Sequence, residues 1–356
     1  MGRAEPGRVV AARYRLRTVI RSDDMGAVWL ANDGLRHRDV VLREVPWAPP
    51  ADAQEQESLR EQLVAEAGAL AALDHPNIVR VLDVAEEDGR PWMVFEAAPY
   101  RFPHRPLSDA VRNDGPLRPE QAAQVGLQVL AAVREAHTVG MLHRAIKPGS
   151  ILLGPGNRVL LADFGMVIAG GSPQLTAPEA LGGSPLYMAP ERASGEPATP
   201  AADLWSLGAA LYAAVEGHAP FGRDGTAAVL TAVMNGCPDP PRRAGLLWPV
   251  LSGLLRKDPS ARPDADAVDW LFRRVAGEHG PPPLAGKVPS PAGAGPPPAV
   301  VAAPQPQAQA ADAENDGSAA DFLPGFGPRD PAPTASEPHV RKSWRRRSIV
   351  IGKAVR

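Results

Sequence analysis

Residues 140–198 are rich in glycine and proline and separate two segments that have a clear helical pattern. Before this stretch, residues 119–139 repeat apolar side chains at three- and four-residue intervals, and Pro119 suits a first helical turn. After it, Thr199 predicts the N-cap of a second helix with a leucine stripe. A long irregular segment inside a compact domain is usually functional, so we expect the chemistry of this chain in 140–198.

The first hundred residues predict a small α+β unit. Short β-branched runs bounded by turn-formers or charges indicate an antiparallel meander over 14–19, 27–32 and 40–45. A helical period follows over 53–73, and two further strands are expected at 79–87 and 92–97. Beyond Pro106 the helical period dominates, with weaker helices expected near 225–234, 246–255 and 264–276.

Charge and cysteine content exclude some classes of protein. The formal charge of −2 hides an uneven distribution, because seven of the 38 Lys and Arg residues lie in the last eighteen positions and no acidic residue does. Residues 1–338 therefore hold 31 basic and 40 acidic side chains, which excludes a uniformly basic nucleic-acid-binding protein. The single cysteine, Cys237, excludes a disulfide-built secreted domain.

Targeting signals are not visible in the sequence. Residues 1–10 lack the apolar core of a signal peptide, and no apolar run approaches the roughly 18–20 residues that span a bilayer. We therefore expect a cytoplasmic protein. Residues 281–338 contain 15 of the 41 prolines and few apolar anchors, so they predict a disordered linker.

Six short motifs stand in order along the chain, beginning with one that covers residues 75–79. The others are His143-Arg144-Ala145-Ile146-Lys147-Pro148, Asp163-Phe164-Gly165, Met188-Ala189-Pro190-Glu191, Asp203-Leu204-Trp205-Ser206-Leu207-Gly208 and Asp258-Pro259-Ser260-Ala261-Arg262-Pro263. In order and spacing they resemble the bacterial, eukaryotic-like Ser/Thr protein kinases. The resemblance implies an α+β, bilobal fold with a β-rich N-lobe, a helical C-lobe and a nucleotide cleft between them. We expect a kinase-like domain over 12–276, a Pro/Ala/Gly-rich disordered linker over 277–338 and a basic tail over 339–356.

The segment that corresponds to the family's glycine-rich loop has lost most of its glycines. Arg21 and Asp23 occupy the first two glycine positions, and only Gly26 remains. Asp23 and Asp24 also place negative charge where the resemblance puts a triphosphate. A plain hairpin whose turn is permitted by Gly26 is an equally good interpretation of this segment.

The resemblance assigns a nucleotide-binding position to Arg43, which replaces the family's phosphate-pairing lysine. A planar guanidinium does not substitute simply for a compact ammonium. The expected partner of Arg43 is Glu66, and such a pair would hold the N-lobe closed without nucleotide. Val41 replaces an alanine against the adenine ring. The other residues that the resemblance places around the base are Val28, Phe95, Glu96, Ala97 and Leu152.

The catalytic loop lacks two groups that the family uses. Ala145 replaces the aspartate that orients and deprotonates the substrate hydroxyl, and Ser150 replaces a magnesium-binding asparagine. Lys147, which supports the γ-phosphate in the family, and Asp163, a metal-binding position, are kept. A positioned general base is worth about 10²–10⁴ in rate. One carboxylate suffices for at most weak binding of ATP and Mg²⁺.

Other retained residues are structural in the family. The resemblance implies that Glu191 pairs with Arg262 and that Asp203 bonds the backbone of the catalytic loop. Arg144 is a candidate partner for a phosphate that another kinase would place on Thr176.

The retained and missing motif residues are compatible with two functions. One is a pseudokinase that acts as a signalling scaffold or regulator through protein partners, with weak ATP binding. The alternative is an active Ser/Thr protein kinase with a rearranged site, favoured by the retained Glu66, Lys147 and Asp163.

The basic tail has three interpretations. In the resembling family a linker of this kind often leads to a membrane helix, and 349–352 resembles the start of one that Lys353 interrupts. Residues 339–356 could instead contact anionic lipid at the inner face of the cell membrane. They could also be a solvated tail that docks on the acidic kinase-like domain.

Overall fold

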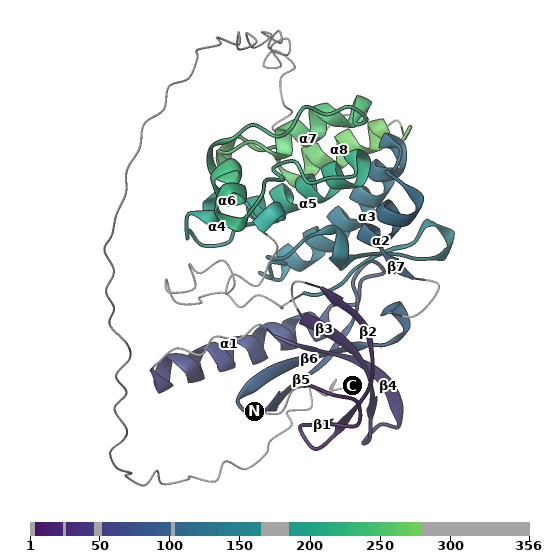
Figure 1. The fold of residues 1–356 in the computed structure, drawn as a ribbon, viewed down its shortest axis with the longest axis vertical. Coiled ribbons are helices and arrows are strands. Elements are labelled where there is room, and N and C mark those ends of the chain that lie inside the picture. Colours follow the sequence, from purple (N-terminus) through teal and green to yellow (C-terminus); the bar gives the residue numbers. More distant parts are fainter. Residues whose placement is uncertain (1–3, 24–25, 46–51, 101–103, 165–184, 279–356) are drawn as a thin grey trace, which may run out of the picture. The chain divides into compact units, whose positions relative to one another are not determined.

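The computed structural model describes residues 4–23, 26–45, 52–100, 104–164 and 185–278, which form a strand-rich part and a helical part (Figure 1). The bilobal α+β fold expected from the sequence is confirmed. Residue 24, the hydroxyl residues of the segment after Asp163 (Ser172, Thr176 and Ser184), the linker beyond residue 278 and the basic tail lie outside the described residues.

The N-lobe is an antiparallel sheet with one long helix. Its strands follow the order β1-β2-β3-β4-β6-β5. Their bounds are Val9–Val10 (β1), Tyr14–Asp23 (β2), Gly26–Asp33 (β3), Arg38–Glu44 (β4), Val81–Glu87 (β5) and Arg90–Glu96 (β6). Helix α1, Ala53–Ala72, lies beside the sheet in Figure 1 and contacts β5. The predicted meander and helix are confirmed.

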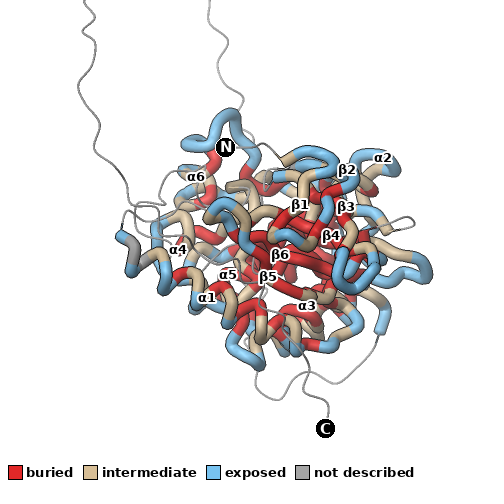
Figure 2. Tube along the Cα trace, turned by 90° about the horizontal axis from the view of Figure 1, so that it is seen from below, coloured by how far each residue is buried: buried red, intermediate tan, exposed pale blue. Residues whose placement is uncertain are grey.

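The two faces of the sheet bury different side chains because successive residues of a strand point to opposite sides. On β4, Val40 and Leu42 join a small core with Trp29 and Trp92. Val41 joins the large core that continues into the C-lobe. The buried strand segments in the middle of Figure 2 belong to these two cores. The face that carries Val41 is therefore the one that packs toward the C-lobe.

The C-lobe is mostly helical. Its helices are α2 (Leu107–Asp114), α3 (Pro119–Thr138), α4 (Pro190–Ala193), α5 (Pro200–Glu216), α6 (Thr226–Asn235), α7 (Trp248–Leu254) and α8 (Ala265–Val275). The five helices expected from periodicity are confirmed to within one or two residues. Helices α2 and α4 were not expected, because eight and four residues are too few to display a period clearly. Thr199 lies at the N-cap of α5, although its side chain makes no capping hydrogen bond.

Helix α5 is the centre of the C-lobe. Fifteen of its residues are buried, as expected for a helix that is apolar on all sides. Helix α3 packs against both α5 and α8, and it approaches them closely at Gly126. A Cβ atom at Gly126 would lie 2.9 Å from a methyl carbon of Leu211 and 2.9 Å from the ring of Phe272. Only glycine therefore permits this helix spacing.

The irregular centre of the chain contains short elements that the sequence pattern did not reveal. Strands β7 (Arg105–Pro106), β8 (Ile151–Leu153) and β9 (Val159–Leu161) form a small sheet in that order. The backbone N–H of Val79 donates to the carbonyl of Leu161 at 2.9 Å, which ties the segment before β5 to this sheet. Strands of two or three residues are too short to show an alternating pattern.

Within the described ranges, none of the helices is both long enough and apolar enough to cross a lipid bilayer.

Candidate functional site

The candidate site lies at the junction of the two lobes, where Asp163 follows strand β9 and is 2% exposed. Two arginines from the N-lobe contact the same oxygen of its carboxylate. Arg43 Nη1 lies 2.8 Å from Asp163 Oδ2, and Arg21 Nη2 lies 3.3 Å from that oxygen. Tyr100 also donates its hydroxyl to Asp163 Oδ1 at 3.4 Å. The carboxylate is therefore surrounded by donors from the protein itself.

Asp163 remains ionised in this environment. Burial raises the pKa of its carboxyl, but the positive charges of Arg43, Arg21 and Lys147 and the hydrogen bond from Arg43 outweigh burial. The pKa therefore lies below its ordinary value. Asp163 adopts a φ of 66°, a left-handed conformation that is uncommon outside glycine and clusters at functional sites.

Arg43 reaches Asp163 because of its position on strand β4. It stands opposite Val28 on β3 and Met93 on β6, and it lies on the same face of the sheet as Val41. Its residue exposure is 1%. A buried guanidinium needs a carboxylate or other acceptors, and Asp163 supplies the opposite charge.

The pair expected between Arg43 and Glu66 stays a prediction, and the structure shows a further partner for Glu66. Glu66 on α1 forms a two-pronged pair with Arg144 of the catalytic loop, at 2.7 Å to Nη1 and 3.1 Å to Nη2. Gln62, one helical turn earlier, donates to Glu66 at 3.0 Å. Both carboxylate oxygens of Glu66 accept hydrogen bonds from these donors. The pairs Glu66–Arg144 and Arg43–Asp163 each join the N-lobe to the C-lobe.

Arg21 was singled out only as a missing glycine, and the structure gives it a role of its own. Strands β2 and β3 stay paired to Asp23 and Gly26, which agrees with the hairpin interpretation, and Gly26 has a φ of 101°. From this hairpin, Arg21 donates to the carbonyl of Gly149 at 2.6 Å as well as contacting Asp163. Its side chain thus crosses from the N-lobe to the catalytic loop.

In the catalytic loop, Ala145 is 7% exposed and has no side-chain group that can accept a proton. Ser150 closes a local turn: its Oγ accepts from the backbone N–H of Lys147 at 3.1 Å and donates to the carbonyl of Lys147 at 2.9 Å. Lys147 is 5% exposed and contributes to the positive potential at Asp163.

The structural contacts expected around this loop are confirmed. Asp203 accepts from the backbone N–H groups of His143 and Arg144 at 2.9 and 2.8 Å. Glu191 and Arg262 form a bidentate pair at 2.6 and 2.7 Å. His143 accepts from Ala145 N through Nδ1, so Nε2 donates to the carbonyl of Ala162 at 2.9 Å. Burial lowers the pKa of His143, which is consistent with a neutral ring.

The apolar side chains expected around an adenine ring are buried. Val28, Val41, Phe95, Ala97 and Leu152 all belong to the main hydrophobic core, with exposures between 0% and 6%. Glu96, the sixth expected residue, has an exposed side chain, and its backbone N–H donates to the carbonyl of Arg80 at 3.0 Å.

Tyr100 was missed by reasoning from sequence. It is 7% exposed, lies 6.0 Å from the ring of Phe95 and reaches Asp163 through its hydroxyl. The Arg21 guanidinium lies 5.9 Å from the Tyr100 ring centre. Burial and the charge of Asp163 raise the pKa of Tyr100 well above its ordinary value, so the hydroxyl keeps its proton. The only sequence signal was an aromatic residue just after a strand that ends in the expected base-binding positions.

Comparison with known families agrees with this arrangement. Residues 25–269 match the family model described as the protein kinase domain. Among similar curated proteins, the serine/threonine-protein kinase PksC of Streptomyces coelicolor is 31% identical over 305 residues, which is 78% of this chain and 52% of that protein.

Two further relatives show the same pattern. The serine/threonine-protein kinase PknA of Mycobacterium tuberculosis is 32% identical over 66% of this chain and 53% of its own length. The serine/threonine-protein kinase PrkC of Bacillus subtilis is 33% identical over 64% of this chain and 34% of its own length. The matched part of the chain thus spans between a third and about half of the length of these relatives.

Proposed function

The chain belongs to the protein kinase family, and from this premise we propose that it is a catalytically impaired member, a pseudokinase that acts as a signalling scaffold or regulator. The kinase-like domain of this proposal covers residues 12–276, followed by the linker 277–338 and the basic tail 339–356. Its ligands are protein partners, because the fold presents a kinase-like surface whether or not phosphate is transferred.

The observation that supports the proposal most strongly is that Arg43 and Arg21 both form ion pairs with the carboxylate of Asp163. Phosphoryl transfer depends almost entirely on positioning and charge neutralisation, so the remaining acidic group must be available to a metal ion. In this structure the guanidinium groups of Arg43 and Arg21 both contact Oδ2 of Asp163, and the Tyr100 hydroxyl donates to Oδ1. The general base is also missing, because residue 145 is alanine.

A magnesium ion, which the family uses with ATP, does not fit this donor set. Mg²⁺ needs oxygen ligands at about 2.0–2.1 Å in near-octahedral geometry. The carboxylate of Asp163 is paired with an arginine side chain. The hydroxyl of Ser150 is hydrogen-bonded to the backbone of Lys147 within the turn that Ser150 closes. No cluster of three or more His, Cys, Asp or Glu side chains suited to a metal ion is found within the described ranges.

A second candidate is an active Ser/Thr protein kinase with rearranged chemistry. The observation in its favour is that Lys147 and Asp163 are both kept and both buried at the same junction, within electrostatic reach of each other. This function requires Arg43 and Arg21 to leave Asp163 when nucleotide binds.

We expect no phosphate transfer when the purified full-length protein is incubated with labelled ATP and either Mg²⁺ or Mn²⁺, alone or with a generic protein substrate. The reason is the loss of the base at Ala145, typically worth about 10²–10⁴ in rate, together with a carboxylate held by arginines. The matched control is Asp163→Ala. Incorporation of label that disappears in this control would establish the active kinase in place of the pseudokinase.

The basic tail is a separate part of the proposal. Its seven Lys and Arg residues lie outside the described residues, and we propose that they bind anionic lipid. Each such residue near a membrane surface is worth about 1 kcal/mol. Full-length protein should co-sediment with phosphatidylserine-containing vesicles and not with neutral phosphatidylcholine vesicles, and a chain that ends at residue 338 should stay in the supernatant. Equal pelleting of the two chains would contradict lipid binding by the tail.

A further inference from the structure

The loop before helix α7 exposes an apolar side chain beside two arginines. Leu246, in the short 3₁₀ helix η6 (Gly245–Leu247), is 74% exposed, the largest fraction among the large apolar side chains of the described residues. Arg242 and Arg243 precede it and are also exposed, and no described carboxylate forms an ion pair with either of them. The carboxylate of Glu216, at the end of α5, accepts from their backbone N–H groups at 3.0 and 2.8 Å. The backbone of this loop is therefore fixed, while both arginine side chains remain accessible to solvent.

A third arginine lies in the same part of the C-lobe. Arg118 is exposed at the start of α3, and its Nε atom donates to the side chain of Gln121 at 3.4 Å. The next residue, Pro119, lies close to the exposed loop, because a Cβ atom at Gly245 would be 3.7 Å from its Cγ. Glu120 is exposed in the same segment, and among the described residues no ion pair joins it to these arginines. We call the following residues the basic C-lobe surface: Arg118, Arg242, Arg243 and Leu246.

The chain leaves the described structure next to this surface. Arg134, near the end of α3, pairs with Asp266, at the start of α8, at 2.7 Å. Further along α8, Phe272 lies beside Gly126 of α3. The two helices therefore run antiparallel, and the end of α8 lies toward the start of α3, where Arg118 is found. The residues that follow 278 thus begin beside the basic C-lobe surface.

The linker contains one segment whose chemistry complements this surface. Residues 312–326 lie outside the described residues, and they hold four of the six acidic side chains of 279–338, at positions 312, 314, 316 and 321. They also hold the only Phe, Tyr or Trp residues of that range, Phe322 and Phe326. Carboxylates match the planar guanidinium group of arginine, and an exposed leucine gives an aromatic ring an apolar contact. The segment therefore carries both kinds of group that the surface can bind.

We propose that residues 312–326 dock on the basic C-lobe surface of the same chain, with their carboxylates on the arginines and their aromatic side chains on Leu246. This contact goes beyond the proposed function, because it does not depend on whether phosphate is transferred. The 33 residues 279–311 separate the segment from the end of the described domain, and a flexible chain of that length spans about 30 Å on average. A tethered contact of this kind works at a millimolar effective concentration, so a weak contact suffices.

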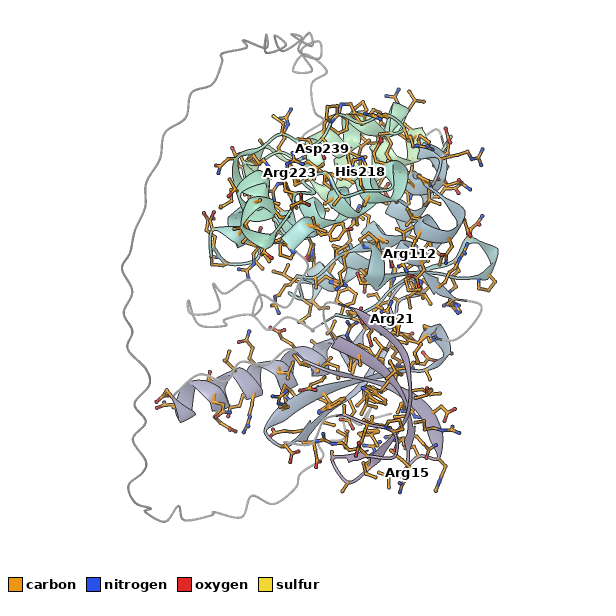
Figure 3. The ribbon with its side chains drawn as sticks, in the orientation of Figure 1. Arg15, Arg21, Arg112, His218, Arg223 and Asp239 are labelled. Carbon is orange, nitrogen blue, oxygen red and sulfur yellow. The ribbon has the colours of Figure 1, made fainter. Side chains whose placement is uncertain are left out.

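The domain as a whole is acidic, so the segment depends on a local group of cations. Residues 1–278 hold 29 basic and 34 acidic side chains. A second group of similar composition lies in the other lobe, in the turn between β3 and β4, where Leu35 is 64% exposed beside Arg36 and Arg38. Figure 3 shows Arg15, which lies close to this turn on β2, at the far end of the strand-rich part, whereas His218, just after α5, lies in the helical part. The chain does not leave the domain beside this turn, so the turn supplies the matched control.

The experiment places a nitroxide spin label on Cys237, the single cysteine of the full-length chain, and records the amide NMR signals of the linker. Cys237 is exposed, and Arg242 follows it by five residues, which span at most about 18 Å. The label should broaden the signals of 312–326 severalfold more than those of 299–310, although 299–310 are closer to the domain along the chain. Added salt should reduce the broadening, because the contact is between exposed charges.

Two double variants test the surface. Arg242→Glu with Arg243→Glu should lower the broadening of 312–326 to the level of 299–310. Arg36→Glu with Arg38→Glu, the matched control, should leave the broadening unchanged. Both double variants change exposed side chains, and thermal unfolding checks that each folds as the native protein does. Broadening should return to the first variant when the charge of the segment is also reversed, through Asp312→Lys, Glu314→Lys and Asp316→Lys.

Several results would overturn this inference. Equal broadening of 299–310 and 312–326 would show that the segment does not dock, and equal losses in the two double variants would indicate general attraction between charges. Broadening that survives Arg242→Glu with Arg243→Glu but disappears in a chain that ends at residue 338 would assign the acidic segment to the basic tail. Broadening of isotope-labelled chains by separate spin-labelled chains would show that the surface binds a second copy. The pseudokinase is tested separately by the phosphate-transfer assay, so none of these results bears on it.

Discussion

Replacing Glu191 with alanine is expected to lower the free energy of unfolding by about 3–5 kcal/mol, because it leaves a buried guanidinium without an opposite charge. Arg262 and Glu191 have side-chain exposures of 1% and 5% and make two parallel hydrogen bonds. Arg262 also donates to the carbonyls of Ala201 and Lys257, at 2.8 and 3.1 Å. The pair therefore joins α4 to the segments around α5 and α8.

Urea denaturation followed by circular dichroism measures this change. The matched control is Asp269→Ala, which breaks the exposed pair with Arg273 within α8 and should cost no more than about 1 kcal/mol. If Glu191→Ala cost as little as this control, the buried pair would not be a principal contact of the C-lobe.

Replacing Arg13 with alanine should have a comparable effect on the N-lobe, about 3–5 kcal/mol at neutral pH. Arg13 donates to both oxygens of Asp33 at 2.7 Å and to Asp83 at 2.8 Å, and both carboxylates are almost fully buried. Tyr14 donates its hydroxyl to Asp83 at 2.6 Å but carries no positive charge. Without Arg13, the carboxylates of Asp33 and Asp83 share a buried site in which no other described side chain is shown to supply a positive charge.

The effect of Arg13→Ala should shrink as the pH falls. In the native protein, burial raises the pKa of Asp33, but the bond and charge of Arg13 outweigh it, and the pKa lies below its ordinary value. The ionised Asp33 therefore stabilises the fold at any pH above the pKa that this residue has in the unfolded chain. This stabilisation is lost as the pH falls through the lower pKa that Asp33 has in the folded protein. Burial raises the pKa of Asp83 even with Arg13 present, and removing Arg13 raises both values further. In folded Arg13→Ala, Asp33 and Asp83 therefore become protonated at a higher pH than in the native protein. As the pH falls, the difference in the free energy of unfolding between the two proteins becomes smaller.

Chemical denaturation at pH 7 and near pH 4.5 tests this dependence. Arg17→Ala, which removes an exposed partner of Asp39 from β2, is the control and should change stability by less than about 1 kcal/mol at either pH. A loss in Arg13→Ala that stays constant over this interval would show that the cost comes from packing rather than from unpaired carboxylates.

Much of the fold could be predicted from local patterns. Helices α3 and α5 and strands β3 and β4 follow from apolar periodicity, because each buries a face of the main core. Helices α2 and α4 and strands β1 and β7 to β9 were missed, since elements of two to eight residues show too little of a period. The apolar residues expected around the base position all belong to the main core, and their role in binding a nucleotide stays a prediction.

Reasoning from sequence named Arg43, Glu66 and Asp163 as candidate site residues. It did not foresee that Arg43 pairs with Asp163 or that Glu66 pairs with Arg144. From sequence alone, each charged side chain could form an ion pair with any of several residues of opposite charge. The choice between them depends on where α1 and the catalytic loop come to lie in space.

By itself, the sequence determined which chemical groups are absent. Residue 145 is alanine and residue 150 is serine, and no arrangement of the chain can restore a carboxylate or an amide at those positions. The tertiary structure alone decided what became of the charge that remains. Arg21 and Asp163 are 142 residues apart in the chain, and only the closing of the two lobes brings them to 3.3 Å. Tyr100 joins them for the same reason, because contacts between distant residues depend on distances in space that no local pattern encodes.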